Sequence, residues 1–201
     1  MIEGRQTLHE PDRERLRLAR PLVLVGLMGA GKSSVGKRLS QLLRVGFVDA
    51  DTEIERAAGM TIPEIFSRLG EPAFRDGERR VIARLMSEAP QVVATGGGAF
   101  IEPRTREEIA RKGRSVWLRA DLDLLWDRVR DRPGRPLLQA ADPKTVLAGL
   151  LATRYPVYGL ADVVVDSRRG ASHEAMARAI VRAVRDAEAG DTAPTLESCD
   201  G

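Results

Sequence analysis

Short apolar runs recur along the chain and alternate with longer segments whose apolar residues follow a helical spacing. The short runs have the length of buried strands and predict strands at 21–25, 46–49, 91–94, 115–118 and 163–165. The longer segments predict helices at 32–43, 61–69, 74–89, 103–111, 122–130, from 142 onward, and at 171–187. Strands that alternate with helices predict βαβ units, and therefore a parallel sheet with helices on both faces.

Capping residues and prolines mark where several of these helices begin or end. Thr61-Ile62-Pro63-Glu64 combines a capping threonine, an early proline and a glutamate three residues later, which is typical of a helix start. Asp121 and Asp142 each precede a predicted helix and are expected to cap it. Pro156 should kink or end the helix in which it lies, because proline removes a backbone donor.

The segment from Gly26 to Ser33, G-L-M-G-A-G-K-S, matches the pattern G-x-x-x-x-G-K-[ST] between a predicted strand and a predicted helix. Its glycines let backbone N–H groups wrap a phosphate, and the helix that starts at Gly31 points its positive end at the same anion. Lys32 suits the β- and γ-phosphates, and the Ser33 hydroxyl suits Mg²⁺. The segment therefore predicts a site for a nucleoside triphosphate with Mg²⁺; the alternative is a glycine-rich helix start with an exposed lysine.

Two aspartates, Asp49 and Asp51, follow the second predicted strand. If the strand continues, residues two apart point the same way, so both carboxylates would project at the ligand-binding edge of the sheet. Capping or turn aspartates are the alternative. The third predicted strand ends in Thr95-Gly96-Gly97-Gly98 rather than in an aspartate, so Asp49 is the expected metal-side acid. The three glycines allow a ligand to approach the backbone closely, or they form a plain flexible turn.

The charge of the chain is mildly basic, and nearly all of its cations are arginine. The formal net charge is +3, and among 32 basic residues lysine occurs only at positions 32, 37, 112 and 144. Such an excess fits either a nucleic-acid surface or sites for phosphate and carboxylate. Because 29 acidic residues are interspersed, we expect no nucleic-acid partner. Arginines crowd the segment 131–141 and its N-terminal flank, where prolines break the helical spacing; this suits a lid, although a solvated face is the alternative.

Length and composition limit the class of protein. A chain of 201 residues with 43% hydrophobic residues predicts one compact domain, which we place at 21–188. Residues 1–20 are expected to be a flexible extension or a short helix, and 189–201 a disordered acidic tail. No apolar run approaches the ~20 residues of a membrane-spanning helix. The single Cys199 and the absence of a secretory signal favour a cytoplasmic location without a membrane partner.

Several segments, taken in order, resemble shikimate kinase over about 21–185. They are G-L-M-G-A-G-K-S-S-V-G at 26–36, F-V-D-A-D at 47–51, I-F-S-R-L-G-E-P-A-F-R-D-G-E at 65–78, T-G-G-G-A at 95–99, R-P-L-L at 135–138 and R-Y-P-V-Y at 154–158. The resemblance implies a three-layer α/β/α P-loop NTPase fold with a five-stranded parallel sheet and a mobile lid at about 130–141. It also implies ATP-dependent phosphorylation of the shikimate 3-hydroxyl, a step toward chorismate and the aromatic amino acids.

The same resemblance implies roles for individual residues. ATP contacts are expected from Gly29, Ala30, Gly31, Lys32, Ser33, Ser34, Arg128, Arg135 and Arg169, with Arg128 at the adenine. Ser33 and Asp49 are expected to hold Mg²⁺, and shikimate is expected to contact Asp51, Arg75, Gly97, Gly98 and Arg154. The catalytic residues would be Lys32, Asp51 and Arg135. The pocket walls would be Phe66, Phe74, Pro136 and Leu137, and Glu78 would orient Arg75 from one helical turn away.

Two other functions fit part of the pattern. A kinase for gluconate or a nucleoside monophosphate would keep the phosphate loop but would not require Asp51, Arg75, the triple glycine and Arg154 together. An ATP-binding regulatory module without activity would not require Lys32, Ser33, Asp51 and Arg135 together. We therefore expect an enzyme with ATP and shikimate as its partners, and we expect a monomer.

Overall fold

A five-stranded parallel sheet forms the centre of the computed structural model, which describes residues 17–130 and 142–191. The strands are β1 (Leu22–Val25), β2 (Gly46–Asp49), β3 (Gln91–Ala94), β4 (Arg114–Arg119) and β5 (Val163–Asp166). Their order is β2-β3-β1-β4-β5, and every neighbouring pair is parallel. The predicted strands and their parallel pairing are therefore confirmed, to within a residue or two at each end.

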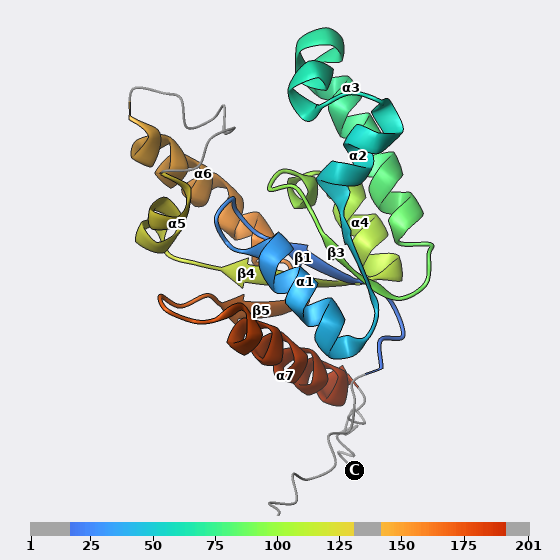
Figure 1. The fold of residues 1–201 in the computed structure, drawn as a ribbon, viewed down its shortest axis with the longest axis vertical. Coiled ribbons are helices and arrows are strands. Elements are labelled where there is room, and N and C mark those ends of the chain that lie inside the picture. Colours follow the sequence, from blue (N-terminus) through green and yellow to red (C-terminus); the bar gives the residue numbers. More distant parts are fainter. Residues whose placement is uncertain (1–16, 131–141, 192–201) are drawn as a thin grey trace, which may run out of the picture.

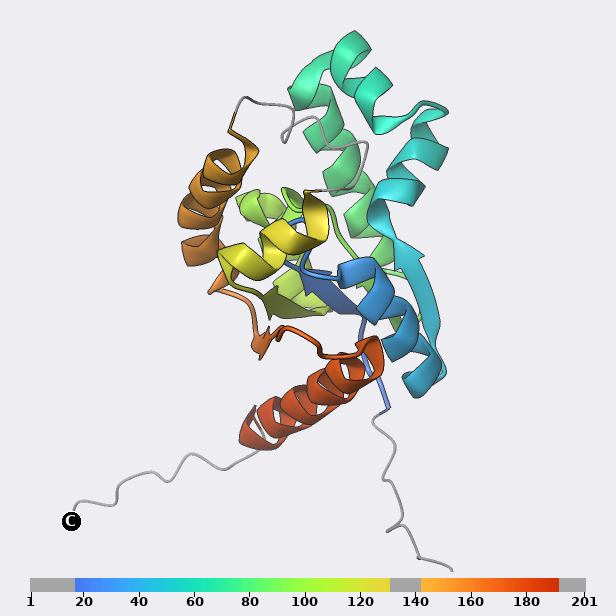
Figure 2. The same cartoon turned by 60° about the vertical axis from the view of Figure 1, so that its left-hand side comes forward.

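Helices cover both faces of the sheet, as expected (Figures 1 and 2). They are α1 (Lys32–Leu43), α2 (Ala50–Ala58), α3 (Ile62–Leu85), α4 (Pro103–Lys112), α5 (Leu122–Val129), α6 (Pro143–Tyr158) and α7 (His173–Asp191), with a 3₁₀ turn η1 (Ala99–Ile101) after β3. Helices α1 and α7 pack together on one face, and α4 with the second half of α3 lies on the other. This is the three-layer α/β/α fold that the alternating pattern predicts.

The central strand β1 lies in the core, and its four residues are all fully buried. At the edge, β5 alternates between the buried Val163 and Val165 and the exposed Val164 and Asp166. Central strands of parallel sheets are covered on both faces and read as continuous apolar runs, whereas an edge strand is half solvated. The buried central strands therefore fix the positions of the segments that follow them at the carboxyl edge of the sheet.

Three helical details differ from the sequence expectation. The segment 50–58 forms α2, which was not expected. The two predicted helices at 61–69 and 74–89 are one element, α3, broken at Gly70 by non-helical backbone angles (φ 79°, ψ 170°) two residues before Pro72. The break precedes the proline because a proline ring clashes with the carbonyl of the preceding turn in a continuous helix. Pro156 does not end α6, which continues to Tyr158.

The predicted caps are present. Thr61 and Glu64 form a reciprocal capping box, and the side chains of Asp121 and Asp142 accept from the backbone N–H groups of Leu124 and Thr145. The last helix, α7, runs to Asp191, three residues past the expected domain end at 188. The expected lid with Arg135, Pro136 and Leu137, and most of both expected tails, lie outside the described residues. None of the helices within 17–130 and 142–191 is long and apolar enough to cross a membrane.

Candidate active site

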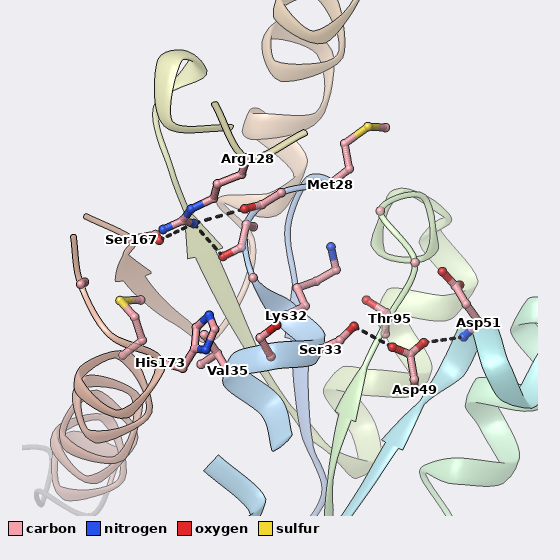
Figure 3. A pocket seen from close by; sticks show the side chains of 18 residues that line it. Met28, Lys32, Ser33, Val35, Asp49, Asp51, Thr95, Arg128, Ser167 and His173 are labelled. Atoms are coloured by element: carbon pink, nitrogen blue, oxygen red, sulfur yellow. Dashed lines mark hydrogen bonds between the residues drawn. The ribbon is translucent and has the colours of Figure 1, made fainter. Parts of the chain in front are cut away.

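A cavity of about 290 Å³ opens at the carboxyl edge of the sheet (Figure 3). The phosphate loop and the start of α1 form its floor. Asp49 and Asp51 lie on one side of it, and Arg128 and His173 on the other. The loops that follow β1, β3 and β5 contribute to its wall, as do the end of β2 and the start of the next helix. Parallel strands deliver their following loops to one edge, which is why segments far apart in sequence meet here.

The phosphate loop needs glycine for both conformation and space. Gly29 has φ +81°, in the left-handed region that other residues rarely adopt. A Cβ at Gly29 would also lie 2.7 Å from Cγ1 of Val129 in α5. The loop is thereby held close to α5, with the first turn of α1 directly behind it, and this geometry suits an anion bound at a helix N-terminus.

Lys32 and Ser33 are the first residues of α1 and line the cavity. The Lys32 ammonium donates to the carbonyl oxygens of Gly26 (2.8 Å) and Leu27 (3.0 Å), which holds its charge over the loop. The Ser33 hydroxyl donates to Oδ2 of Asp49 at 2.7 Å. Lys32, the Ser33 hydroxyl and the Asp49 carboxylate therefore all line the same cavity (Figure 3).

Asp49 is both a helix cap and part of the site. Its Oδ1 accepts from the backbone N–H of Asp51 at 3.1 Å and so caps α2, while its Oδ2 faces Ser33. The Ser33 and Asp49 oxygens are the hard donors that Mg²⁺ prefers, and such sites use one or two protein oxygens with the remainder from water and phosphate. No larger cluster of metal-ligating side chains occurs in the described parts of the chain. The pair therefore fits a phosphate-bound Mg²⁺.

Asp51 reaches the site by a different route from the one expected. The strand ends at Asp49, and Asp51 lies in the first turn of α2, so the alternation of a strand does not orient it. Its carboxylate lies against the glycine loop: a Cβ at Gly96 would be 2.7 Å from Asp51 Oδ1. Burial, and next the negative charge of Asp49, raise the pKa of Asp51 above its usual value.

Arg75 lies on α3 in a network of carboxylates. It donates to Glu78 Oε2 at 2.7 Å and to Glu71 Oε1 at 3.1 Å. Glu78 is only 2% exposed, and burial raises its pKa although the neighbouring Arg75 opposes the shift. The pairing fits the expected orienting role of Glu78 for Arg75. The guanidinium lies against Gly98, where a Cβ would be 2.5 Å from Arg75 Nη1.

The triple glycine is therefore a place of close approach. Side chains from α2 and α3 press on Gly96 and Gly98, and from the other side Arg154 of α6 donates Nη1 to the Gly97 carbonyl oxygen at 3.1 Å. The Tyr158 hydroxyl donates to the same oxygen. Asp51, Arg75 and Arg154 thus meet at one loop beside the phosphate loop. A plain flexible turn would not need this contact on both sides.

On the side of the cavity opposite the aspartates, Arg128 joins two loops. Its Nη1 donates to the Gly29 carbonyl oxygen at 3.2 Å and to the Ser167 hydroxyl at 3.0 Å (Figure 3). Arg169 instead pairs with Asp127, with its side chain 68% exposed, and it is not among the described residues that line the cavity. Its contact with ATP stays a prediction.

Several lining residues were missed at the sequence level. They are Met28, Val35, Thr95, Ser167, Ala171, His173 and Met176. Ser167 follows the fifth strand directly, so the rule that ligands bind at carboxyl ends of strands could have found it. His173 and Met176 belong to α7, and no local pattern distinguishes them from other helical residues.

The expected aromatic wall is partly formed. The rings of Phe66 and Phe74 lie 4.6 Å apart, and the Arg75 guanidinium lies 5.1 Å from the Phe74 ring centre. Phe74 is buried and Phe66 is 39% exposed. The Phe74 ring therefore contacts both the Phe66 ring and the Arg75 guanidinium, which fits a wall beside this arginine.

Comparison with known proteins shows which family the chain matches. The sequence model described as "Shikimate kinase" matches residues 28–185. A shikimate kinase of Bradyrhizobium diazoefficiens is 59% identical over 75% of this chain and 72% of its own, and one of Rhizobium leguminosarum bv. trifolii is 51% identical over 94% and 97%. A shikimate kinase structure from Acinetobacter baumannii, in complex with shikimate, superposes with a TM-score of 0.78 at 39% identity, over 83% of this chain and 93% of that one.

Proposed function

Because the chain belongs to the shikimate kinase family, we propose that it transfers the terminal phosphate of ATP to the 3-hydroxyl of shikimate. The products are shikimate 3-phosphate and ADP, and the reaction is a step in the biosynthesis of chorismate and the aromatic amino acids. The observation that supports this most directly is the meeting of Asp51, Arg75 and Arg154 at the glycine loop 96–98 beside the phosphate loop.

Charge neutralisation and positioning supply most of the catalysis of phosphoryl transfer. The phosphate loop and the positive end of α1 hold the triphosphate, and Lys32 neutralises charge on its outer phosphates. Arg128 lies next to the loop and faces the space where the nucleotide base would lie. Ser33 and Asp49 would hold Mg²⁺, which would neutralise phosphate charge when bound.

Asp51 takes the acceptor side. Its carboxylate lines the cavity next to the phosphate loop and accepts a hydrogen bond from the reacting hydroxyl. As the hydroxyl oxygen bonds to the terminal phosphorus, the bond from that phosphorus to the bridging oxygen breaks, ADP leaves with that oxygen, and the hydroxyl proton passes to an Asp51 oxygen. A raised pKa brings this carboxylate nearer to the working pH, which favours a proton acceptor.

The two arginines, one from α3 and one from α6, grip the carboxylate of shikimate at the glycine loop. Guanidinium groups suit this role because their planar fork donates two parallel hydrogen bonds to a carboxylate. Glu78 and Glu71 hold Arg75 in place, and the Gly97 carbonyl anchors Arg154. Backbone N–H groups of Gly97 and Gly98 bind the substrate at the same loop.

A coupled assay of ADP release tests the function. Shikimate, gluconate and nucleoside monophosphates are offered to the folded protein with ATP and Mg²⁺, and we expect release with shikimate alone. Folded protein that releases no ADP with shikimate refutes the proposal. Arg135 as a transition-state cation, a cytoplasmic location and a monomeric state stay predictions beside it.

A further inference from the structure

We propose that Tyr158 is a positioning residue for the binding of shikimate. Its hydroxyl donates to the Gly97 carbonyl oxygen and thereby sets the orientation of the Gly97–Gly98 peptide. The inference rests on the proposed function, because shikimate is the ligand that this peptide would meet. Tyr158 itself acts through the loop and need not touch the substrate.

Two donors from one helix converge on a single carbonyl oxygen. Arg154 and Tyr158 are four residues apart on α6 and therefore lie on the same helix face. Arg154 Nη1 donates to the Gly97 oxygen at 3.1 Å, and the Tyr158 hydroxyl donates to the same atom. The helix thus holds a loop that lies 57 and 61 positions earlier in the chain.

Anchoring this carbonyl determines where the next N–H group points. A trans peptide is planar, so the Gly97 C=O and the Gly98 N–H point in opposite directions. With the oxygen held on the α6 side, the Gly98 N–H is turned away from α6. A peptide between two glycines can rotate more freely than one between other residues. A hydrogen bond from another element therefore restricts its orientation more strongly here.

The hydrogen bond from Tyr158 to the Gly97 carbonyl oxygen is expected to persist when substrate binds, more than the bond from Arg154. Tyr158 is fully buried, and the rings of Trp117 and Tyr155 lie 5.9 Å and 6.2 Å from its own. Burial raises the pKa of Tyr158 to about 12, so its hydroxyl stays a donor at physiological pH. Arg154 has to share its N–H groups between the Gly97 carbonyl and the carboxylate of the substrate.

The neighbouring Tyr155 provides a matched control. It lies on the same helix and packs on the same Trp117 ring, at 4.9 Å, and its hydroxyl also donates to a backbone carbonyl oxygen, that of Ala120. Ala120 lies outside the glycine loop. Tyr155→Phe therefore removes an equivalent hydroxyl without releasing the Gly97–Gly98 peptide.

The experiment compares Tyr158→Phe, Tyr155→Phe and the wild type by calorimetric titration with shikimate and by steady-state kinetics. For Tyr158→Phe we expect the Kd and KM of shikimate to rise about fivefold, the usual effect of one lost hydrogen bond, with the KM of ATP unchanged. For Tyr155→Phe we expect both shikimate constants to stay within about twofold of wild type, with a comparable fall in Tm.

If Tyr158→Phe and Tyr155→Phe have the same Kd and KM for shikimate, the Tyr158 hydroxyl only stabilises the fold. That result would overturn the inference. If Tyr158→Phe does not fold, wild-type protein with isotope-labelled glycine serves instead. We expect shikimate to shift the Gly98 amide resonance, and an unmoved resonance would refute the inference. Wild type that neither binds nor phosphorylates shikimate refutes the proposed function as well, whereas an active wild type with unaltered Tyr158→Phe refutes this inference alone.

Discussion

The two sides of the active site are built in different ways. The phosphate side comes from one short segment, 26–33, in which a strand, a glycine loop and a helix start follow each other directly. The acceptor side comes from four elements, with Asp51 on α2, Arg75 on α3, the glycine loop after β3 and Arg154 on α6. Phosphate binding thus depends on local backbone geometry, and acceptor binding depends on how the helices pack.

The largest effect that would separate the two sides is expected from Asp51→Asn. The amide cannot accept the proton of the reacting hydroxyl, so kcat should fall by about 10²- to 10⁴-fold, the usual range for general acid–base groups. The affinity for ATP, measured by calorimetry, should stay within about twofold, because no bond between Asp51 and the phosphate loop is needed to hold ATP. Near-normal turnover would contradict the role of Asp51.

Arg154→Ala tests the acceptor side alone. Loss of charge-assisted hydrogen bonds to a carboxylate should raise the KM of shikimate by about 10- to 100-fold and leave the KM of ATP unchanged. Arg79→Ala is the control, because Arg79 is a half-exposed arginine on α3 that pairs with Asp76 and not with the glycine loop. An unchanged shikimate KM in Arg154→Ala, or an equal change in both variants, would refute the assignment.

A pair of glycine substitutions tests whether the two loops are independent. Gly29→Ala puts a methyl group into a left-handed position and 2.7 Å from Val129, so ATP affinity should fall about tenfold. Gly98→Ala displaces the Arg75 guanidinium, so shikimate affinity should fall by about the same factor. Each variant should keep its other affinity in calorimetric titrations; a loss of both affinities in both variants would mean that the loops move as one unit.

The smallest expected effect is a pH dependence. Asp51 must be ionised to accept a proton, and its pKa lies above the usual value because of burial and Asp49. kcat/KM should therefore fall as the pH is lowered through this raised pKa, so the acidic limb should lie at higher pH than for an ordinary aspartate. A rate that is flat down to the usual aspartate pKa would show that Asp51 does not titrate as the proton acceptor.

Asp51 and α2 illustrate where prediction from the sequence fails. The aspartate pair and the strand at 46–49 were identified, but the common direction of the two carboxylates was argued from strand alternation, whereas a helix begins directly after Asp49. The sequence D-A-D fits both a strand end and a capped helix start, because aspartate is a good cap. Which of the two forms depends on where α2 packs against α3, and no local pattern shows that.

Segment-level features were therefore predictable from the sequence alone. The apolar runs located all five strands, of which β1, β3 and β4 are buried nearly throughout. The capping residues and G-x-x-x-x-G-K-[ST] located helix starts and the phosphate loop. These features depend on periodicity and backbone geometry within about ten residues.

Only the tertiary structure decided the contacts that join distant segments. Three sets of contacts link residues tens of positions apart. Asp51 and Arg75 lie close against Gly96 and Gly98, Arg154 and Tyr158 donate to the same Gly97 carbonyl oxygen, and Arg128 donates to Ser167. Such contacts arise when parallel strands bring their carboxyl ends to one edge and the helices pack around it, so their distances are set by the whole fold.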